Sequence, residues 1–108
     1  MSNSELLDHI EKILIKFPVT SRKMFGGIGI FSEDVMFALI YDEIVYLKST
    51  PEIAKTYSED STQFEPPFRR TMKMPYWSIP EKILRDWDRF ADWAYKSLEY
   101  AKMTKKKK

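Results

Sequence analysis

The residues best suited to binding chemistry form a basic and aromatic cluster in the second half of the chain. Its members are Arg69, Arg70, Lys73, Tyr76 and Trp77. Cations can hold phosphates and aromatic rings can stack on bases, so nucleic-acid contact is one interpretation of the pattern. The alternative is an edge strand that charge protects from pairing, with both rings packed inward. A protein-binding surface is the third interpretation.

Catalytic chemistry finds little support in the sequence. There is no cysteine and only one histidine, His9, which excludes thiolate and multi-histidine metal sites within one chain. We expect His9 on the exposed face of a helix. The Gly26–Gly29 cluster lacks the lysine and hydroxyl residue of a phosphate loop, so it indicates backbone geometry: positive φ, a bulge or close strand packing. Two acidic pairs fall in predicted turns: Glu33-Asp34 and Asp42-Glu43. We therefore predict no catalytic, cofactor-binding or metal-binding residues.

Charge is concentrated at the C-terminus. The net charge is +2. Without the four final lysines, the chain has 14 basic and 16 acidic residues and a net charge of −2. We expect one domain over residues 1–103 and a flexible lysine tail over 104–108, which alone binds nucleic acid weakly. The sequence has no signal-peptide pattern and no apolar run near the ~20 residues of a membrane helix, so we expect a cytoplasmic protein.

Periodicity predicts the elements of the N-terminal half. Apolar residues at helical spacing predict a helix over 5–17, with Ser2 and Glu5 as a capping box and Pro18 ending it. Antiparallel strands joined by short turns are predicted over 20–25, 28–31, 35–41 and 44–48. If the first of these strands lies beside the strand of the basic cluster, it adds two further cations: Arg22 and Lys23.

The C-terminal half is predicted to be mainly helical. A short helix is expected over 51–57, and residues 70–77 return to the sheet as a strand. The last helix is expected over 80–102, with Ser78 as its cap and a bend near Asp86. Its apolar stripe consists of Ile83, Trp87, Phe90, Ala91, Ala94, Leu98 and Ala101. Trp93 lies off this stripe, on a second face of the helix. These elements predict an α+β fold: an N-terminal helix, an antiparallel sheet of four to five strands and C-terminal helices.

The segment Val35–Tyr41 is apolar on both of its faces. Strict alternation divides it into two sets: Val35, Phe37, Leu39 and Tyr41 against Met36, Ala38 and Ile40. An antiparallel strand with one wet face would alternate with polar residues. We therefore expect a central strand covered on both sides, by helices of this chain or by a partner.

Residues 22–31, Arg-Lys-Met-Phe-Gly-Gly-Ile-Gly-Ile-Phe, resemble the opening of the TfoX N-terminal domain. The similarity continues through 36–40 and 45–48 and resumes at Met74-Pro75-Tyr76-Trp77, so that it covers nearly the whole chain. It implies an α+β fold similar to the secretion-chaperone-like fold. TfoX (Sxy) proteins regulate bacterial natural competence, with an activator protein at competence promoters. The family has no established catalytic residues, so the resemblance implies none in this sequence. Full members have a second, helical domain, and we expect this chain to be a stand-alone first domain.

The leading hypothesis is a non-enzymatic regulatory module that binds another protein, such as a transcription activator or a second copy as a homodimer. The predicted interaction residues are Arg22, Lys23, Arg69, Arg70, Lys73, Tyr76 and Trp77. The alternative is direct nucleic-acid binding through the same cluster and the lysine tail. The third hypothesis is an enzyme with a small-molecule pocket beside the glycines.

Overall fold

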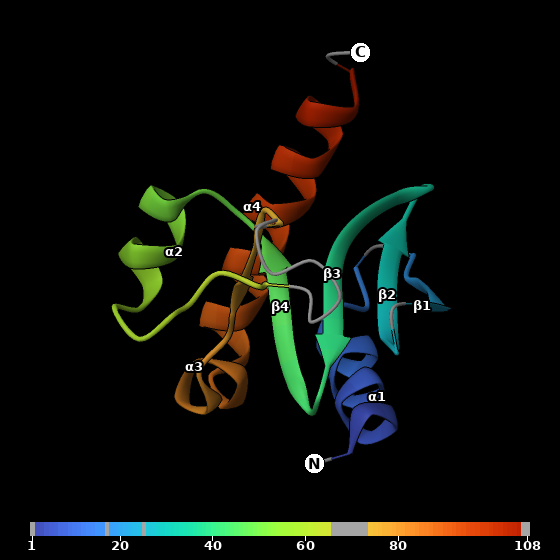
Figure 1. The fold of residues 1–108 in the computed structure, drawn as a ribbon. Helices are drawn as coiled ribbons and strands as arrows, with labels where there is room; N and C mark the ends of the chain where they lie inside the picture. The colour runs from blue at the N-terminus through green and yellow to red at the C-terminus, as the bar shows by residue number, and fades with distance from the viewer. Residues whose placement is uncertain (1, 17, 25, 66–73, 107–108) are drawn as a thin grey trace.

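Five strands form one antiparallel sheet in the computed structural model, and their spatial order is the order of the chain (Figure 1). The structure describes residues 2–16, 18–24, 26–65 and 74–106. The elements are α1 (Asn3–Ile13), β1 (Thr20–Met24), β2 (Gly27–Ser32), β3 (Val35–Tyr41), β4 (Ile44–Lys48), α2 (Pro51–Tyr57), β5 (Tyr76–Ser78), α3 (Glu81–Arg85) and α4 (Trp87–Lys106). The predicted α+β fold is confirmed.

Two tight turns set the register of the central strands. Glu33 and Asp34 join β2 to β3 with φ of 53° and 67°, and Asp42 and Glu43 join β3 to β4 with φ of 51° and 63°. Positive φ at both central residues defines the type I′ turn, whose twist matches that of the strands it joins. The two-residue connection predicted at Asp42-Glu43 is therefore confirmed, and the turn predicted over Ser32-Glu33-Asp34 is one residue shorter, since Ser32 is the last residue of β2.

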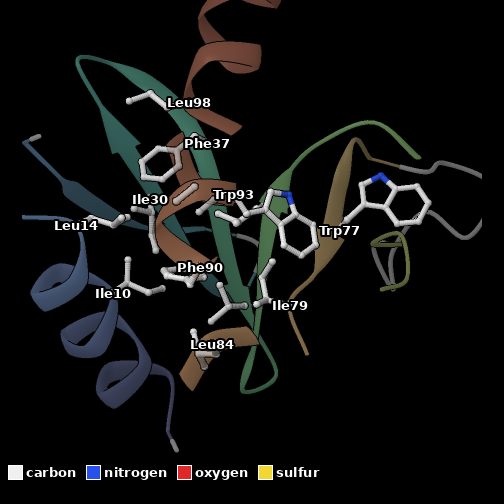
Figure 2. Packing of buried hydrophobic residues seen from close by; sticks show 14 of the residues in the cluster. Ile10, Leu14, Ile30, Phe37, Trp77, Ile79, Leu84, Phe90, Trp93 and Leu98 are labelled. Carbon is white, nitrogen blue, oxygen red and sulfur yellow. The ribbon is translucent and has the colours of Figure 1, made fainter. Parts of the chain in front are cut away.

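Helices α1 and α4 cover one face of the sheet, which we call the inner face (Figure 1). Figure 2 shows Ile10 of α1 and Leu14, which directly follows this helix, meeting Ile30 from the sheet and Phe90 from α4 in one buried cluster. The capping box predicted for α1 is present, since Ser2 Oγ accepts from Glu5 N and Glu5 Oε1 accepts from Ser2 N. Helical spacing thus supplies most of the core above the sheet.

A β-bulge in β3 changes which side chains reach the inner face. Ile30 pairs with Ala38, but the next residue, Phe31, pairs with Met36, so Phe37 is the extra residue. Phe37 therefore joins Ala38 in the cluster beneath the helices, while Met36 packs on the other face. The strict alternation predicted for this strand is wrong beyond the bulge. The prediction of a central strand covered on both faces is confirmed.

The helix ends differ from the predicted ones. Helix α1 ends at Ile13, four residues early, because Leu14 leaves the helical conformation while its side chain stays buried. Ser78 is not a helix cap: it lies in β5, and Pro80 is the N-cap of α3 without a side-chain bond. Helix α4 continues to Lys106, so residues 104–106, predicted as part of the tail, are helical in backbone.

The predicted bend near Asp86 is a complete break between α3 and α4. Asp86 has φ of −89° and ψ of 93°, outside the helical region. The break resets the helical phase, which explains why the stripe predicted for one continuous helix does not hold on both sides of it: Trp87 is 52% exposed and Trp93 is fully buried.

The expectation that His9 is exposed is also wrong, since its ring is half-buried. Its Nε2 donates to the carbonyl oxygen of Leu84 at 3.1 Å.

Candidate interaction surface

The predicted interaction residues do not form one cluster. Arg22 and Lys23 are exposed on β1, whereas Tyr76 and Trp77 lie on β5, and these two strands form opposite edges of the sheet. The prediction that the two strands are neighbours is therefore wrong. A meander in chain order separates its first and last strands by the full width of the sheet. The other three predicted residues fall outside the described part of the chain: Arg69, Arg70 and Lys73.

Tyr76 and Trp77 are core residues rather than the rim that we predicted. They are 5% and 8% exposed and, as neighbours in a strand, they point to opposite faces. Trp77 packs in the inner cluster, and Tyr76 packs on the other face of the sheet with Leu39 and Phe64. The inward packing of both rings agrees with that part of the edge-strand alternative, although residues 62–64 hydrogen-bond along the outer edge of this strand.

We call the face of the sheet opposite α1 and α4 the outer face. Pairing across the strands places one row of residues on it: Arg22, Gly29, Leu39 and Tyr46. A second row on the same face joins Thr20, Phe31 and Met36 beyond the bulge. Residues paired across an antiparallel sheet share a face, so the register alone brings these side chains together.

Phe64 covers the part of the outer face formed by β3 and β4. Its ring makes edge contacts with Tyr41 and Tyr46, with centroids 5.4 and 4.9 Å away. Edge-to-face packing of this kind is favourable for aromatic rings. Beneath it, Tyr76 Oη donates to the carbonyl oxygen of Met36 at 3.4 Å. This end of the outer face therefore has a cover from its own chain.

The β1 and β2 end of the outer face has a different character. The guanidinium of Arg22 lies 5.1 Å from the centre of the Phe31 ring, a cation–π contact. Met24 lies across Gly29, where an added Cβ would be 2.6 Å from its Sδ. Phe31, Met24 and Met36 are each half-buried. We define the outer patch as Arg22, Met24, Phe31 and Met36, where Met36 of β3 also packs against the cluster of Leu39, Phe64 and Tyr76.

Sequence reasoning found only Arg22 of the outer patch. The other three side chains come from three strands, and only the pairing register brings them together. The bulge in β3 is what turns Met36 to the same side as Phe31. The signal available in the sequence was the doubly apolar β3, which indicated a second covered face without naming its residues.

Burial beneath Phe64 changes the acid–base behaviour of Tyr76. Desolvation raises the pKa of Tyr76 to about 12 and lowers the pKa of Lys48, its partner across β4 and β5. A pKa raised on folding contributes stability below the unfolded pKa of 10.0 that is lost as pH rises through 12.

We therefore expect the free energy of unfolding to fall by about 2–3 kcal/mol between pH 10 and 12 through Tyr76 alone. Urea unfolding at a series of alkaline pH values measures this loss, and the Tyr76→Phe variant should lack that share of it. An alkaline loss of full size in Tyr76→Phe would contradict the assignment.

A concave region of about 970 Å³ lies beside the glycines, at the end of the sheet. It is lined by the N-cap Ser2, by Asn3 and Ser4 of α1, and by Lys23, Gly26, Gly27, Asp42 and Glu43, among others. The lining mixes charges of both signs.

Among the described residues no group of three or more histidine, cysteine or acidic side chains is placed to hold a metal ion. In the same part of the chain, no helix combines the length and the apolar character needed to span a membrane.

Comparison with known proteins matches this chain to a family model and to a curated relative. The sequence model of the TfoX N-terminal domain family matches residues 15–101. A protein of Aliivibrio fischeri described as "DNA transformation protein TfoX1" is 33% identical over 58 residues, which cover 49% of this chain and 28% of that protein. The matched region thus spans less than a third of that relative's length.

Proposed function

Because this chain belongs to the TfoX N-terminal domain family, we propose that it is a regulatory module that binds a protein partner and catalyses no reaction. The matched relative is described as a DNA transformation protein, so we place the module in the control of DNA transformation, in the cytoplasm. The matched region covers 28% of that relative, and the role we propose is limited to partner contact.

One observation supports the proposal most: the outer patch combines Arg22, Phe31 and two methionines on one rigid sheet face. Arginine, aromatic residues and methionine are the types enriched where proteins meet. Methionine adapts its shape to a partner, and the ring of Phe31 is already held by Arg22, so little side-chain freedom is lost on binding.

The described cations favour a protein over a nucleic acid as partner. Arg22 and Lys23 are neighbours in β1, so they point to opposite faces of the sheet. Only Arg22 belongs to the outer patch, and one cation gives little of the phosphate neutralisation that nucleic-acid affinity requires. The nucleic-acid alternative therefore depends on Arg69, Arg70 and Lys73, which lie outside the described residues.

A photo-crosslinking amino acid at position 31 tests the proposal in the host cell. We expect irradiation to produce one discrete adduct of higher mass, because Phe31 lies at the centre of the patch. The same amino acid at position 82, exposed on α3, should give no such adduct.

Charge reversal supplies the matched control for this experiment. Arg22→Glu should reduce the yield of the adduct by about tenfold, as expected when a rim charge that favours encounter is inverted. Lys82→Glu makes the same change of charge away from the patch and should leave the yield unchanged. Equal adducts from positions 31 and 82, or no adduct at position 31, would refute the proposal.

A further inference from the structure

The two edges of the sheet are finished differently. Along β5, Phe64 N donates to the carbonyl oxygen of Tyr76 at 2.8 Å and Ser78 N donates to that of Thr62 at 2.9 Å. Residues 62–64 therefore occupy the outer hydrogen-bonding edge of this strand. Along β1 the described residues pair with β2 only, on one side. With respect to residues 2–16, 18–24, 26–65 and 74–106, the β1 edge thus offers unpaired backbone donors and acceptors, which are a template for another strand.

The side chains of β1 decide which strand the edge can accept. Thr20, Ser21, Arg22 and Lys23 are all exposed, and the strand carries no acidic residue. Within the described part of the chain neither Arg22 nor Lys23 forms an ion pair. An antiparallel pair of two β1 strands centred on Arg22 would place like charges opposite each other, which is destabilising. The charges of β1 therefore disfavour a second copy and favour an acidic strand.

We propose that β1 binds a short extended segment of the partner protein, which adds to the sheet as a sixth strand and carries two adjacent acidic residues. Adjacent residues in a strand point to opposite faces, so one carboxylate meets Arg22 on the outer face and the next meets Lys23 on the inner face. The sixth strand continues the outer patch sideways, beside Met24. This inference rests on the proposed function and names the chemistry of the partner.

The acidic stretch must be short. Lys23 lines the same concave region as Asp42 and Glu43, at the end of β1 next to Gly26. A third acidic residue placed toward that end would lie opposite Met24, which offers no positive charge. The fitting segment is therefore a pair of acidic residues flanked by residues that favour strands, such as valine and threonine.

Synthetic peptides test the inference without knowledge of the partner. The probe is a fluorescent peptide with two central glutamates between valine and threonine residues, and the control peptide carries two lysines instead. We expect the glutamate peptide to bind the full chain, measured by anisotropy, and to slow amide hydrogen exchange in β1. Two pairs of opposite charge across strands should make its affinity at least about tenfold higher than that of the lysine peptide.

Backbone methylation separates strand addition from simple charge attraction. Two further peptides carry N-methyl groups on one or the other alternate set of residues, and only one set faces β1 in a paired strand. One methylated peptide should lose binding and the other should keep it. Arg22→Glu in the chain should weaken the glutamate peptide by about tenfold, whereas Lys82→Glu should not.

Three results would overturn the inference: no binding of the glutamate peptide, equal binding of the lysine peptide, or equal binding of both methylated peptides. Each of these leaves the proposed function standing if position 31 still crosslinks to a partner. Absence of that crosslink would contradict the proposed function itself. The crosslink therefore distinguishes failure of strand addition at β1 from failure of the protein-binding role.

Discussion

Trp93→Ala should lower the free energy of unfolding by about 3–5 kcal/mol, a large share of the stability of a domain of this size. Trp93 is fully buried in the inner cluster, and its ring stacks on Tyr57 with centroids 4.9 Å apart and planes 6° from parallel. Alanine leaves a cavity between α4, α2 and the sheet that the rigid elements around it cannot close. Urea unfolding followed by circular dichroism measures the change.

Two variants keep this prediction specific. Trp93→Phe preserves part of the packing, and Trp93 Nε1 has no hydrogen-bond partner among the described residues, so we expect a smaller cost, about 1–2 kcal/mol. Trp87→Ala removes the same side chain from a position that is 52% exposed and should cost clearly less than Trp93→Ala. If Trp93→Ala and Trp87→Ala were equally stable, the placement of Trp93 at the centre of the core would be wrong.

Gly27→Ala should be the most disruptive of the glycine substitutions, with a cost of about 3 kcal/mol or more. A Cβ at position 27 would lie 2.1 Å from the carbonyl oxygen of Ile40, which belongs to the backbone of the neighbouring strand. A backbone atom cannot rotate away as a side chain can. The substitution must therefore push β2 away from β3 at the centre of the sheet.

Gly26→Ala is the matched control, since it tests conformation rather than space. Gly26 has φ of 78°, and an added Cβ would lie 3.7 Å from the Tyr41 ring, an ordinary contact. Alanine there costs only the left-handed backbone strain, about 1–2 kcal/mol. Chemical denaturation of both variants gives the comparison, and a larger loss for Gly26→Ala would contradict the close packing of β2 on β3.

The glycines illustrate how far the sequence could be interpreted. Their cluster without a phosphate-loop partner predicted backbone geometry, and two of the three expected reasons are present: positive φ at Gly26 and close strand packing at Gly27. The turns and the strand Val35–Tyr41 were predictable for the same reason, because turn chemistry and apolar runs are local signals. The family was also predictable, since its motifs lie in order along most of the chain.

The candidate surface was mostly beyond reach because it depends on pairing between distant residues. No local pattern marks Phe37 as the extra residue of a bulge, although this residue decides that Met36 faces outward. The separation of Arg22 from Tyr76 likewise follows from strand order, which is a property of the whole sheet. The phase shift at Asp86 exchanged the expected places of Trp87 and Trp93 in the same way.

The measurement that tests the central claim most directly is mass spectrometry of the adduct crosslinked through position 31, purified and treated with nuclease. We predict that the adduct keeps its added mass and yields peptides of a second polypeptide, with about a tenfold lower yield of the adduct in Arg22→Glu. An adduct that nuclease returns to the mass of the free chain would contradict a protein-binding role and identify the outer patch as a nucleic-acid contact.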